Sequence, residues 1–361
     1  MIEGIIPSEI ADEPEAIRST VEAARPPAGE LADAFRSAGV RRVHVIGNGT
    51  SYHSALAVAF AYRRVARGDD PILLPVTAGE FRTYLPGLAA GDAVLGISAS
   101  GEFRDVVAVV GELRGRVPTA AVVHVPGSTL ARTADQVVLS AGGPSAVPVM
   151  TKTFASTLAA GLLVAGELLG GDRADAMARA LLATADAAAI AIGLAMAAVD
   201  GLAERHAATE HLYVIGGGGG YPAALEAALK LKEMALVHAE GAETWEAESG
   251  VATLLGPTAT VLALAPPGPG QQAVRDLARN SAAWGARVIE VAPEQAVDGA
   301  ELLPIPSTAG EDLASLTSVP PVALFAYALA RARGLDPDRP GWTERYRAQG
   351  LTHVIGAEAT T

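Results

Sequence analysis

The chain has 361 residues, of which 50% are hydrophobic, and its 27 Lys and Arg are outnumbered by 40 Asp and Glu. Domains commonly hold roughly 100 to 200 residues, so this length predicts two of them. The formal net charge of −13 argues against a general nucleic-acid or anionic-membrane surface, because such surfaces need an excess of Lys and Arg. The absence of cysteine excludes disulfides, Cys-ligated metal clusters and a cysteine nucleophile.

The longest smooth apolar run, Ala187 to Val199, has 13 residues and falls short of the roughly 20 that a membrane span needs. The first 17 residues, MIEGIIPSEIADEPEAI, are acidic and lack the basic and apolar regions of a secretory signal. We therefore expect a cytoplasmic protein that contacts neither membrane nor nucleic acid. We also expect no metal site, because the seven histidines are scattered without ligand spacing.

Residues 1–35 are predicted to form a helical segment, in which a helix from Glu13 to Ala38 is broken at Pro26 and Pro27. Short Val, Ile and Leu runs without polar alternation then indicate strands buried on both faces of a parallel sheet. These predicted strands are Arg42 to Ile46, Pro71 to Leu74, Ala93 to Ile97, Ala120 to Val125 and Gln136 to Leu139. A glycine pair at residues 170–171 suits a short hinge before a second long helix, Ala174 to His206.

The chain repeats itself once. VHVIGNGTSYHSALAVAFAY, from Val43, aligns with LYVIGGGGGYPAALEAALKL, from Leu212, at an offset of 169 residues (212 minus 43). The second copy is predicted to contain the strands Leu212 to Ile215, Thr260 to Ala265, Ala286 to Val291 and Leu302 to Ile305. An acidic loop from Gly241 to Gly250 is expected in place of its second strand. The repeat predicts an α/β protein with domains over residues 36–170 and 171–340, followed by a tail over residues 341–361.

Two glycine-rich segments, residues 47–51 and 216–220, each follow a strand and open a helix. Free backbone N–H groups and the helix dipole favour an anion there. A Rossmann fingerprint would need a third glycine at Tyr52 or Tyr221 and an acidic residue after the second strand, and both features are missing. We therefore expect no dinucleotide and no other cofactor. The alternative is a tight strand-to-helix turn with no ligand.

The segment ISASGE, from Ile97 to Glu102, ends the third strand of the first copy with two serines and a glycine. Two hydroxyls and exposed amides can bind a phosphate without Lys or Arg. The second copy has Ala-Pro-Pro-Gly at this place, residues 265–268, so only the first copy is predicted to bind phosphate. The alternative, a serine that caps a helix, explains one hydroxyl better than both.

The motifs GNGTSYH, ISASGE, HVPGSTLARTAD, TKTF and YPAALEAALKLKEMALVHAE resemble the SIS (sugar isomerase) domain family, specifically the isomerase half of the glucosamine-6-phosphate synthases, over roughly residues 36 to 355. The resemblance implies two flavodoxin-like SIS domains, a homodimer and an active site between the copies for a small-molecule sugar 6-phosphate. It implies that Ser51, Ser98 and Ser100 bind the phosphate. The other residues expected around the phosphate are Gly49, Thr50, Gly101, Glu102 and Thr151.

A predicted helix from Ala223 to His238 places Glu226, Lys230 and Glu233 on one face. By itself this spacing also suits a solvated, salt-bridged face. The resemblance implies that Glu233 moves a proton between C1 and C2 of the sugar and that Lys230 lies near the reacting atoms. Such chemistry requires a base, whose pKa we expect burial to raise, and a cation near the developing enediolate oxygen.

Five positions depart from the family pattern, and two of them, Glu248 and Val251, flank Ser249 and replace a lysine and a proline. Ser249 replaces the histidine that opens the sugar ring, Phe103 replaces a threonine after the SGE motif, and Met150 replaces a serine before the TK motif. His238 could act as an acid beside the ligand, and His353 could take the role of the missing histidine or that of the lysine in the family's C-terminal LSKV segment. The alternatives are a structural histidine at a helix end for His238 and a frayed terminus for His353. The glutamates within residues 240–248 are interpreted either as a site for a substrate amine or as a solvated loop.

These observations favour a cofactor-free enzyme that isomerises or deaminates an amino sugar 6-phosphate, or a related adduct, by proton transfer between C1 and C2. Glutamine hydrolysis by the family's cysteine nucleophile is not expected, because the chain has no cysteine. A simple aldose–ketose phosphosugar isomerase is one alternative. A non-catalytic phosphosugar-binding regulatory module is the other, and the loss of the ring-opening histidine at Ser249 favours it.

Overall fold

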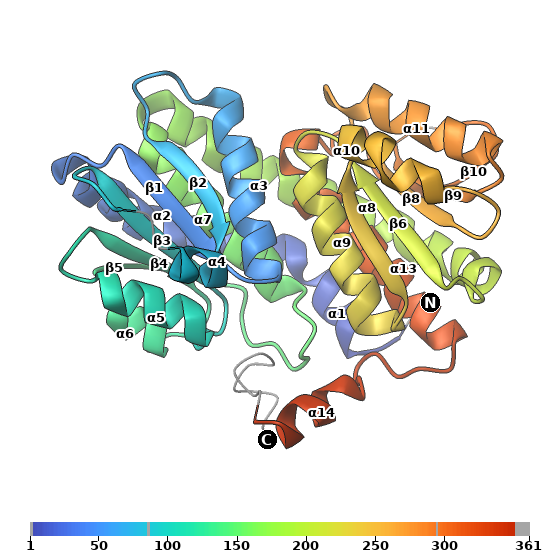
Figure 1. Cartoon of the computed structure of the whole chain (residues 1–361), viewed down its shortest axis with the longest axis horizontal. Coiled ribbons are helices and arrows are strands. Elements are labelled where there is room, and N and C mark those ends of the chain that lie inside the picture. Colours follow the sequence, from blue (N-terminus) through green and yellow to red (C-terminus); the bar gives the residue numbers. More distant parts are fainter. Residues whose placement is uncertain (1–2, 85–86, 294, 351–361) are drawn as a thin grey trace. The chain divides into compact units, whose positions relative to one another are not determined.

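The computed structural model describes residues 3–84, 87–293 and 295–350. It divides into two compact units, one formed by residues 13–183 and 341–361 and the other by residues 1–12 and 184–340. Each unit contains one five-stranded parallel sheet with helices on both faces (Figure 1). The prediction of an α/β protein with two parallel sheets is therefore confirmed.

The sheet of residues 13–183 has the strand order β2-β1-β3-β4-β5, and all its neighbouring strands pair in parallel. Its strands are β1 (Arg42–Gly47), β2 (Ile72–Thr77), β3 (Asp92–Ser98), β4 (Thr119–Val123) and β5 (Gln136–Leu139). All five were predicted from their apolar runs, and β3 and β4 are buried along their whole length. A central strand of this kind has no solvent-facing side, which explains why its sequence does not alternate.

Helices α2 (Glu13–Ser37), α3 (Thr50–Val65) and α7 (Lys152–Leu169) pack together on one face of this sheet. The other face is covered by α4 (Ala78–Thr83), α5 (Arg104–Leu113) and α6 (Thr129–Thr133), as Figure 1 shows. A cluster of buried Val, Leu, Ile and Phe side chains fills the space beneath α5. Burial of these side chains supplies the main stabilising term for this layer.

The predicted break of the first long helix at Pro26 and Pro27 is wrong, because α2 continues through both prolines. A proline removes one intrahelical hydrogen bond, that of the carbonyl four residues earlier. Those carbonyls belong to residues 22 and 23, which are exposed, so water can bond them. Buried Ala24 and Ala28 continue the packed stripe on both sides of the proline pair, and the packing outweighs the local preference.

The second sheet has the strand order β10-β9-β8-β6-β7. Its strands are β6 (His211–Gly216), β7 (His238–Glu243), β8 (Thr260–Leu264), β9 (Arg287–Ala292) and β10 (Ala300–Pro304). Four of them were predicted, but the expected acidic loop was wrong: it is divided between β7 and helix α10 (Thr244–Ser249). β7 is an edge strand whose only buried residues are alanines, so it lacks the β-branched run that marks the other strands.

Helices α9 (Gly220–Ala235), α12 (Ala314–Thr317) and α13 (Val319–Ala332) pack on one face of the second sheet. The other face carries α10, α11 (Gln271–Ala283) and the 3-10 helix η1 (Val251–Leu254), which enclose a second apolar cluster. The remaining elements are α1 (Ile5–Ala11), α8 (Gly171–His206), η2 (Glu311–Leu313) and α14 (Trp342–Ala348).

Helix α1 packs against α13 within the unit of residues 1–12 and 184–340. The Asp338 carboxylate accepts hydrogen bonds from the backbone N–H groups of Ile5 (3.1 Å) and Ile6 (2.9 Å). It also accepts one from the Tyr327 hydroxyl at 3.0 Å. One carboxylate thus caps the start of α1, where free backbone donors need a partner.

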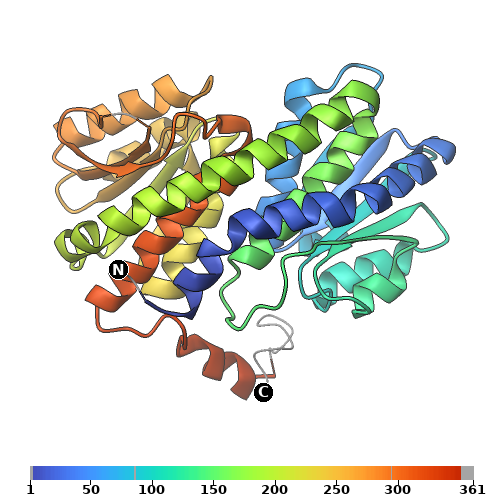
Figure 2. The same ribbon diagram turned by 180° about the vertical axis from the view of Figure 1, so that it is seen from behind.

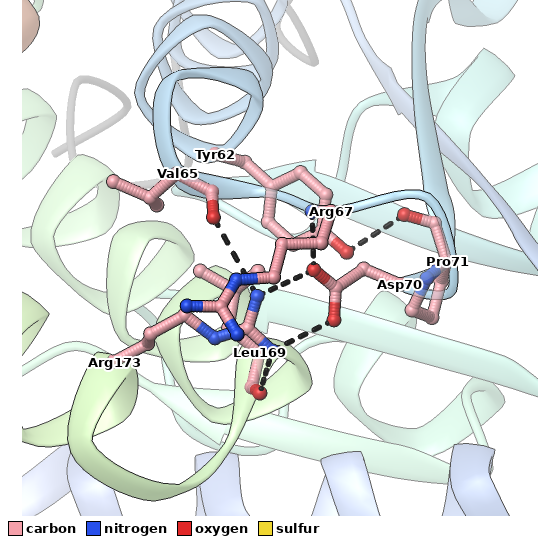
Figure 3. Close-up of polar contacts among 7 residues, drawn as sticks. All are labelled: Tyr62, Val65, Arg67, Asp70, Pro71, Leu169 and Arg173. Atoms are coloured by element: carbon pink, nitrogen blue, oxygen red, sulfur yellow. Dashed lines mark hydrogen bonds and ion pairs between the residues drawn. The ribbon is translucent and has the colours of Figure 1, made fainter.

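Helices α7 and α8 meet at Gly170 and Gly171, whose φ angles of 69° and 53° suit glycine and strain other residues. An ion pair anchors this turn: the Arg173 guanidinium contacts both carboxylate oxygens of Asp70, at 2.5 and 2.8 Å, and donates to the Leu169 carbonyl at 2.7 Å (Figure 3). Hydrogen bonding to Arg173 lowers the pKa of Asp70 below its ordinary value. At the glycine pair where the sequence suggested a short hinge, the structure has a tight turn that this ion pair anchors.

Three helical stretches are long and apolar enough, by length and composition, to cross a membrane: α7, α8 and residues 311–332. In α7 and in residues 311–332, 94% of the apolar window is buried inside the fold, so that apolarity serves core packing. In α8, a continuous 36-residue helix visible in Figure 2, the buried share is 44%. The expectation of no membrane contact stays a prediction.

Candidate active site

The first glycine loop joins β1 to α3. Its Gly49 precedes the first turn of α3 and has a φ of 52°, which a side chain would strain. Thr50 is buried and begins the helix, while Ser51 is half-buried and its N–H donates to the Asn48 carbonyl at 3.1 Å. The loop therefore places the Ser51 hydroxyl at the amino end of a 16-residue helix, where the helix dipole attracts an anion.

The second loop follows β3 and contains the two predicted serines. Ser98 Oγ accepts a hydrogen bond from the Gly101 N–H at 3.1 Å, and Ser100 Oγ accepts one from the Glu102 N–H at 3.3 Å. A hydroxyl that accepts from the backbone still has its own proton to donate. Because β1 and β3 pair directly, both loops leave the same edge of the sheet. The structure thus brings the predicted phosphate-binding serines to one edge.

Gly101 is required by its surroundings. Its φ is 65°, and a Cβ added there would lie 2.0 Å from the Ser128 hydroxyl oxygen. Glu102 turns its carboxylate to the start of α6, where it accepts a hydrogen bond from the Thr129 N–H at 2.8 Å. The Glu102 side chain therefore fixes the loop to α6. Thr151 is buried at the start of α7.

The two bulky replacements lie beside these elements. Phe103 precedes the first turn of α5, and Met150 comes directly before Thr151; both are half-buried. Neither side chain offers the hydroxyl that the family has at its position. Phosphate binding in this chain would therefore depend on the remaining serines and backbone amides.

Helix α9 carries a buried ion cluster. Lys230 is 1% exposed, and its Nζ lies 3.1 Å from Glu226 Oε1 and 2.8 Å from Glu233 Oε2. Burial alone lowers the pKa of Lys230, but the charges of Glu226 and Glu233 outweigh it and raise that pKa above its ordinary value. Lys230 is therefore a cation at neutral pH. The interpretation of this stripe as a solvated face is wrong, because Glu226 and Lys230 are both fully buried.

Glu233 is the exposed end of the cluster, with 23% of its side chain accessible. Its Oε2 accepts a hydrogen bond from the Lys230 ammonium at 2.8 Å. The expected rise of its pKa by burial stays a prediction. An accessible carboxylate that a hydrogen bond holds in place is positioned for proton transfer.

Helix α9 ends at Ala235, three residues before its predicted end, because Leu236 adopts a left-handed conformation with a φ of 51°. His238 is therefore the first residue of β7, and its expected place at a helix end is wrong. It is exposed and faces His211 on β6, with the two Nδ1 atoms 3.5 Å apart. This histidine pair lies at the amino ends of β6 and β7.

Ser249, which stands in place of the ring-opening histidine, is exposed on α10 and donates its hydroxyl proton to the Trp245 carbonyl at 3.1 Å. Glu243, the first glutamate before this helix, accepts hydrogen bonds from the N–H groups of Trp245 (2.8 Å) and Glu246 (3.2 Å). Its carboxylate is thus used as a helix cap. His353 lies outside the described residues.

No group of three or more His, Asp or Glu residues that could hold a metal ion occurs within residues 3–84, 87–293 and 295–350. The second glycine loop, however, contains a feature that the sequence did not indicate. The Glu311 carboxylate lies inside it and accepts hydrogen bonds from the Gly219 and Gly270 N–H groups. In the sequence this copy differs from the first by a run of five glycines and by the absence of serines after β8, but neither difference points to Glu311.

The SIS domain family model matches residues 38–165 and 207–326. The chain therefore belongs to the SIS domain family, a family with phosphosugar isomerases among its members. It is 35% identical over 341 residues to the glutamine–fructose-6-phosphate aminotransferase (isomerizing) of Pyrobaculum aerophilum, an alignment that covers 92% of this chain and 55% of that protein. The chain thus spans about half the length of this curated relative.

Solved structures share the fold. The C-terminal domain of glucosamine-fructose-6-phosphate aminotransferase from Francisella tularensis matches 94% of this chain and 99% of its own, with a TM-score of 0.83 and 23% identity. Tagatose-6-phosphate ketose/aldose isomerase from Escherichia coli matches 94% of this chain and 95% of its own, with a TM-score of 0.78 and 19% identity. The predicted pair of SIS domains is confirmed.

Proposed function

We propose that the protein is an enzyme that transfers a proton between C1 and C2 of an amino sugar 6-phosphate or a related adduct, as an isomerase or deaminase without a cofactor. The observation that carries the proposal is the ion cluster of Glu226, Lys230 and Glu233. Buried ion clusters are weak sources of stability, because apolar residues of similar size often serve as well. A partly exposed carboxylate held by a buried cation fits a role in proton transfer better.

In this mechanism, Glu233 removes the proton from C2 and returns it to C1. Negative charge develops on the oxygen at C1 while the proton is on Glu233, and the Lys230 cation stabilises that charge. With an amine at C2, return of the proton to C1, together with transfer of one amine proton to the oxygen at C1, leaves a hydroxymethyl group at C1 and an imine at C2. Water adds to the imine carbon and ammonia leaves, which gives the ketose phosphate.

The proposal assigns phosphate binding to residues 36–170. Hydroxyl protons of Ser51, Ser98 and Ser100 would be donated to phosphate oxygens, as the family resemblance implies. The positive φ angles of Gly49 and Gly101 shape the two loops. The glycine loops also supply backbone amides, so the site needs no Lys or Arg. This arrangement suits a chain whose net charge is −13.

The proposal assigns proton transfer to residues 171–340 and includes a cytoplasmic homodimer, which rests on the family resemblance. A simple aldose–ketose isomerase would use the same proton transfer at C2 without loss of ammonia. A phosphosugar-binding regulatory module is favoured by one observation: the Ser249 hydroxyl bonds its own helix at the position of the ring-opening histidine.

The test is to incubate the protein with a panel of hexose and hexosamine 6-phosphates in deuterated water and to follow exchange at C2 by NMR. Ammonia release, measured in parallel, separates deamination from isomerisation. Absence of exchange with every sugar that binds contradicts the enzyme proposal and supports the binding module. Exchange that survives Glu233→Gln contradicts the assignment of the base. Glu210→Gln, at an exposed position on the same unit, is the matched control.

A further inference from the structure

The second glycine loop encloses a carboxylate of the same chain. Gly219 and Gly270 directly precede two long helices, α9 and α11. The Gly219 N–H donates to Glu311 Oε1 at 3.2 Å, and the Gly270 N–H donates to Glu311 Oε2 at 2.5 Å. Glu311 is only 6% exposed. Two helix amino ends, each with roughly half a positive charge, therefore meet one buried negative charge.

The Glu311 side chain fits in this loop only because the residues around it are glycines. A side chain on Gly218 or Gly268 would collide with Glu311. A Cβ at Gly218 would lie 2.0 Å from Glu311 Oε1, and a Cβ at Gly268 would lie 2.3 Å from Glu311 Cβ. A Cβ at Gly270 would lie 3.0 Å from Glu311 Oε2. The glycine run of residues 216–220 and the segment 268–270 thus form a cradle that fits the Glu311 side chain.

A second polar group faces the same cradle without a partner. Thr244 is fully buried, and its Oγ1 makes no hydrogen bond within the part of the chain that the structure describes. A Cβ at Gly217 would lie 3.2 Å from this Oγ1 and 3.2 Å from Gly270. A buried hydroxyl without a partner is uncommon. It provides one more donor beside the two amides that already hold Glu311.

The cradle corresponds to the candidate phosphate loops of the first copy. In each sheet one loop follows the strand that opens the copy, β1 or β6, and the other follows its direct neighbour, β3 or β8. We propose that residues 216–220 and 268–270 form a second anion-binding site, which the Glu311 carboxylate occupies and which takes a small oxyanion when that carboxylate is removed. The proposal does not depend on the enzymatic activity proposed above.

Glu311→Ala deletes an acetate-sized fragment, so acetate is the probe. We expect this variant to unfold at a lower temperature than the wild type in chloride, and acetate at equal ionic strength to raise its Tm by roughly 5 °C at saturation. The wild type should not respond, because its cradle is filled. Glu210→Ala removes an exposed charge from the same unit and should not respond either.

Glu311→Gln distinguishes the effect of an empty cavity from the effect of a lost carboxylate charge. The amide fills the cavity, but its NH2 group faces a backbone N–H donor, so we expect a lowered Tm that acetate does not restore. If Glu311→Ala fails to fold in chloride, recovery of folded protein by refolding in acetate is the readout. An acetate response of Glu311→Ala no larger than that of Glu210→Ala overturns the proposal, as does wild-type stability of Glu311→Gln.

Equilibrium dialysis with labelled inorganic phosphate measures how many phosphate ions bind to each chain. One phosphate per wild-type chain and two per Glu311→Ala chain support the second site. One phosphate on both proteins overturns it for phosphate and leaves the proposed function intact. No phosphate on the wild type and one on Glu311→Ala support the second site and contradict phosphate binding by the first copy.

Discussion

The two copies of the repeat have the same strand order around their first strand but use the helix after it differently. In the second copy α9 carries the buried Glu226 and Lys230; counting back 169 residues from each gives Ala57 and Ala61 on α3. In the first copy the loops carry serines, whereas in the second the corresponding loops hold Glu311. The difference fits the division of labour that we propose, in which the first copy binds the phosphate and the second provides the proton-transfer chemistry.

The largest effect expected from this division concerns Glu233. We expect Glu233→Gln to lower kcat by about 100- to 10,000-fold, because it removes the proton acceptor while KM changes little. Steady-state kinetics with the substrate found by C2 exchange provide the measurement. A rise in KM with unchanged kcat would assign Glu233 to binding and would break the proposed division.

Lys230→Met tests the buried charge of the second copy. The substitution leaves Glu226 buried without its cation, so we expect the free energy of unfolding to fall by about 3 to 5 kcal/mol. Urea denaturation measures the change. Lys232→Met, on the exposed side of the same helix, should have little effect. The double variant Glu226→Gln/Lys230→Met should recover part of the loss; a double variant less stable than Lys230→Met would show that charge burial is not the cause.

Ser98→Ala tests the anion loop of the first copy. Loss of one hydroxyl donor to a charged phosphate should raise the Kd for the sugar phosphate by about 10- to 100-fold, with kcat less affected. Isothermal titration calorimetry measures the Kd. Ser249→Ala makes the same substitution at an exposed position of the second copy and should leave the Kd unchanged. Equal Kd values for Ser98→Ala and wild type would remove Ser98 from the site.

The smallest expected effects concern the pH dependence of stability, which should differ between the ion pairs of the two units. Because Arg173 lowers the pKa of Asp70, this pair stabilises the fold above the ordinary Asp pKa of about 3.9, and its contribution is lost as pH falls below it. We expect Asp70→Asn to lower the free energy of unfolding by about 1 kcal/mol at pH 7. Urea denaturation should show the difference from wild type shrinking towards pH 3; a constant difference would exclude the ion pair as the cause.

Lys230 should give the opposite pH dependence in the other unit. Its pKa is raised in the folded state, so its contribution is complete below the ordinary Lys pKa of about 10.4 and is lost as pH rises above it. The difference in stability between wild type and Lys230→Met should therefore shrink at strongly alkaline pH. A difference that grows with pH would contradict the assignment of Lys230 as a paired cation.

Most of the fold could be predicted because buried parallel strands have a strong local signal. The edge strand β7 lacked that signal, since its buried residues are alanines between polar neighbours. The predicted break of α2 at its prolines was wrong for a related reason. The local preference of proline was outweighed by packing of α2 against α7, and the sequence does not show which helices pack together.

The candidate site was predictable only in part. Spacing placed Glu226, Lys230 and Glu233 on one helix face, but it could not show that two of these charged residues are buried, because charged residues are usually exposed. Glu311 could not be found from spacing at all. It lies 92 positions from Gly219, and only the folded sheet brings the two together.

The binding of α1 by Asp338 has a consequence for the order in which the chain folds. The two residues that α1 presents to this carboxylate precede it by more than 330 positions, and the whole of residues 13–183 lies between them in the sequence. During synthesis, the first sheet has all its strands once β5 has left the ribosome. Helix α1, although made first, has to wait for residue 338 before it can dock, so the earliest segment translated is among the last to reach its native contacts.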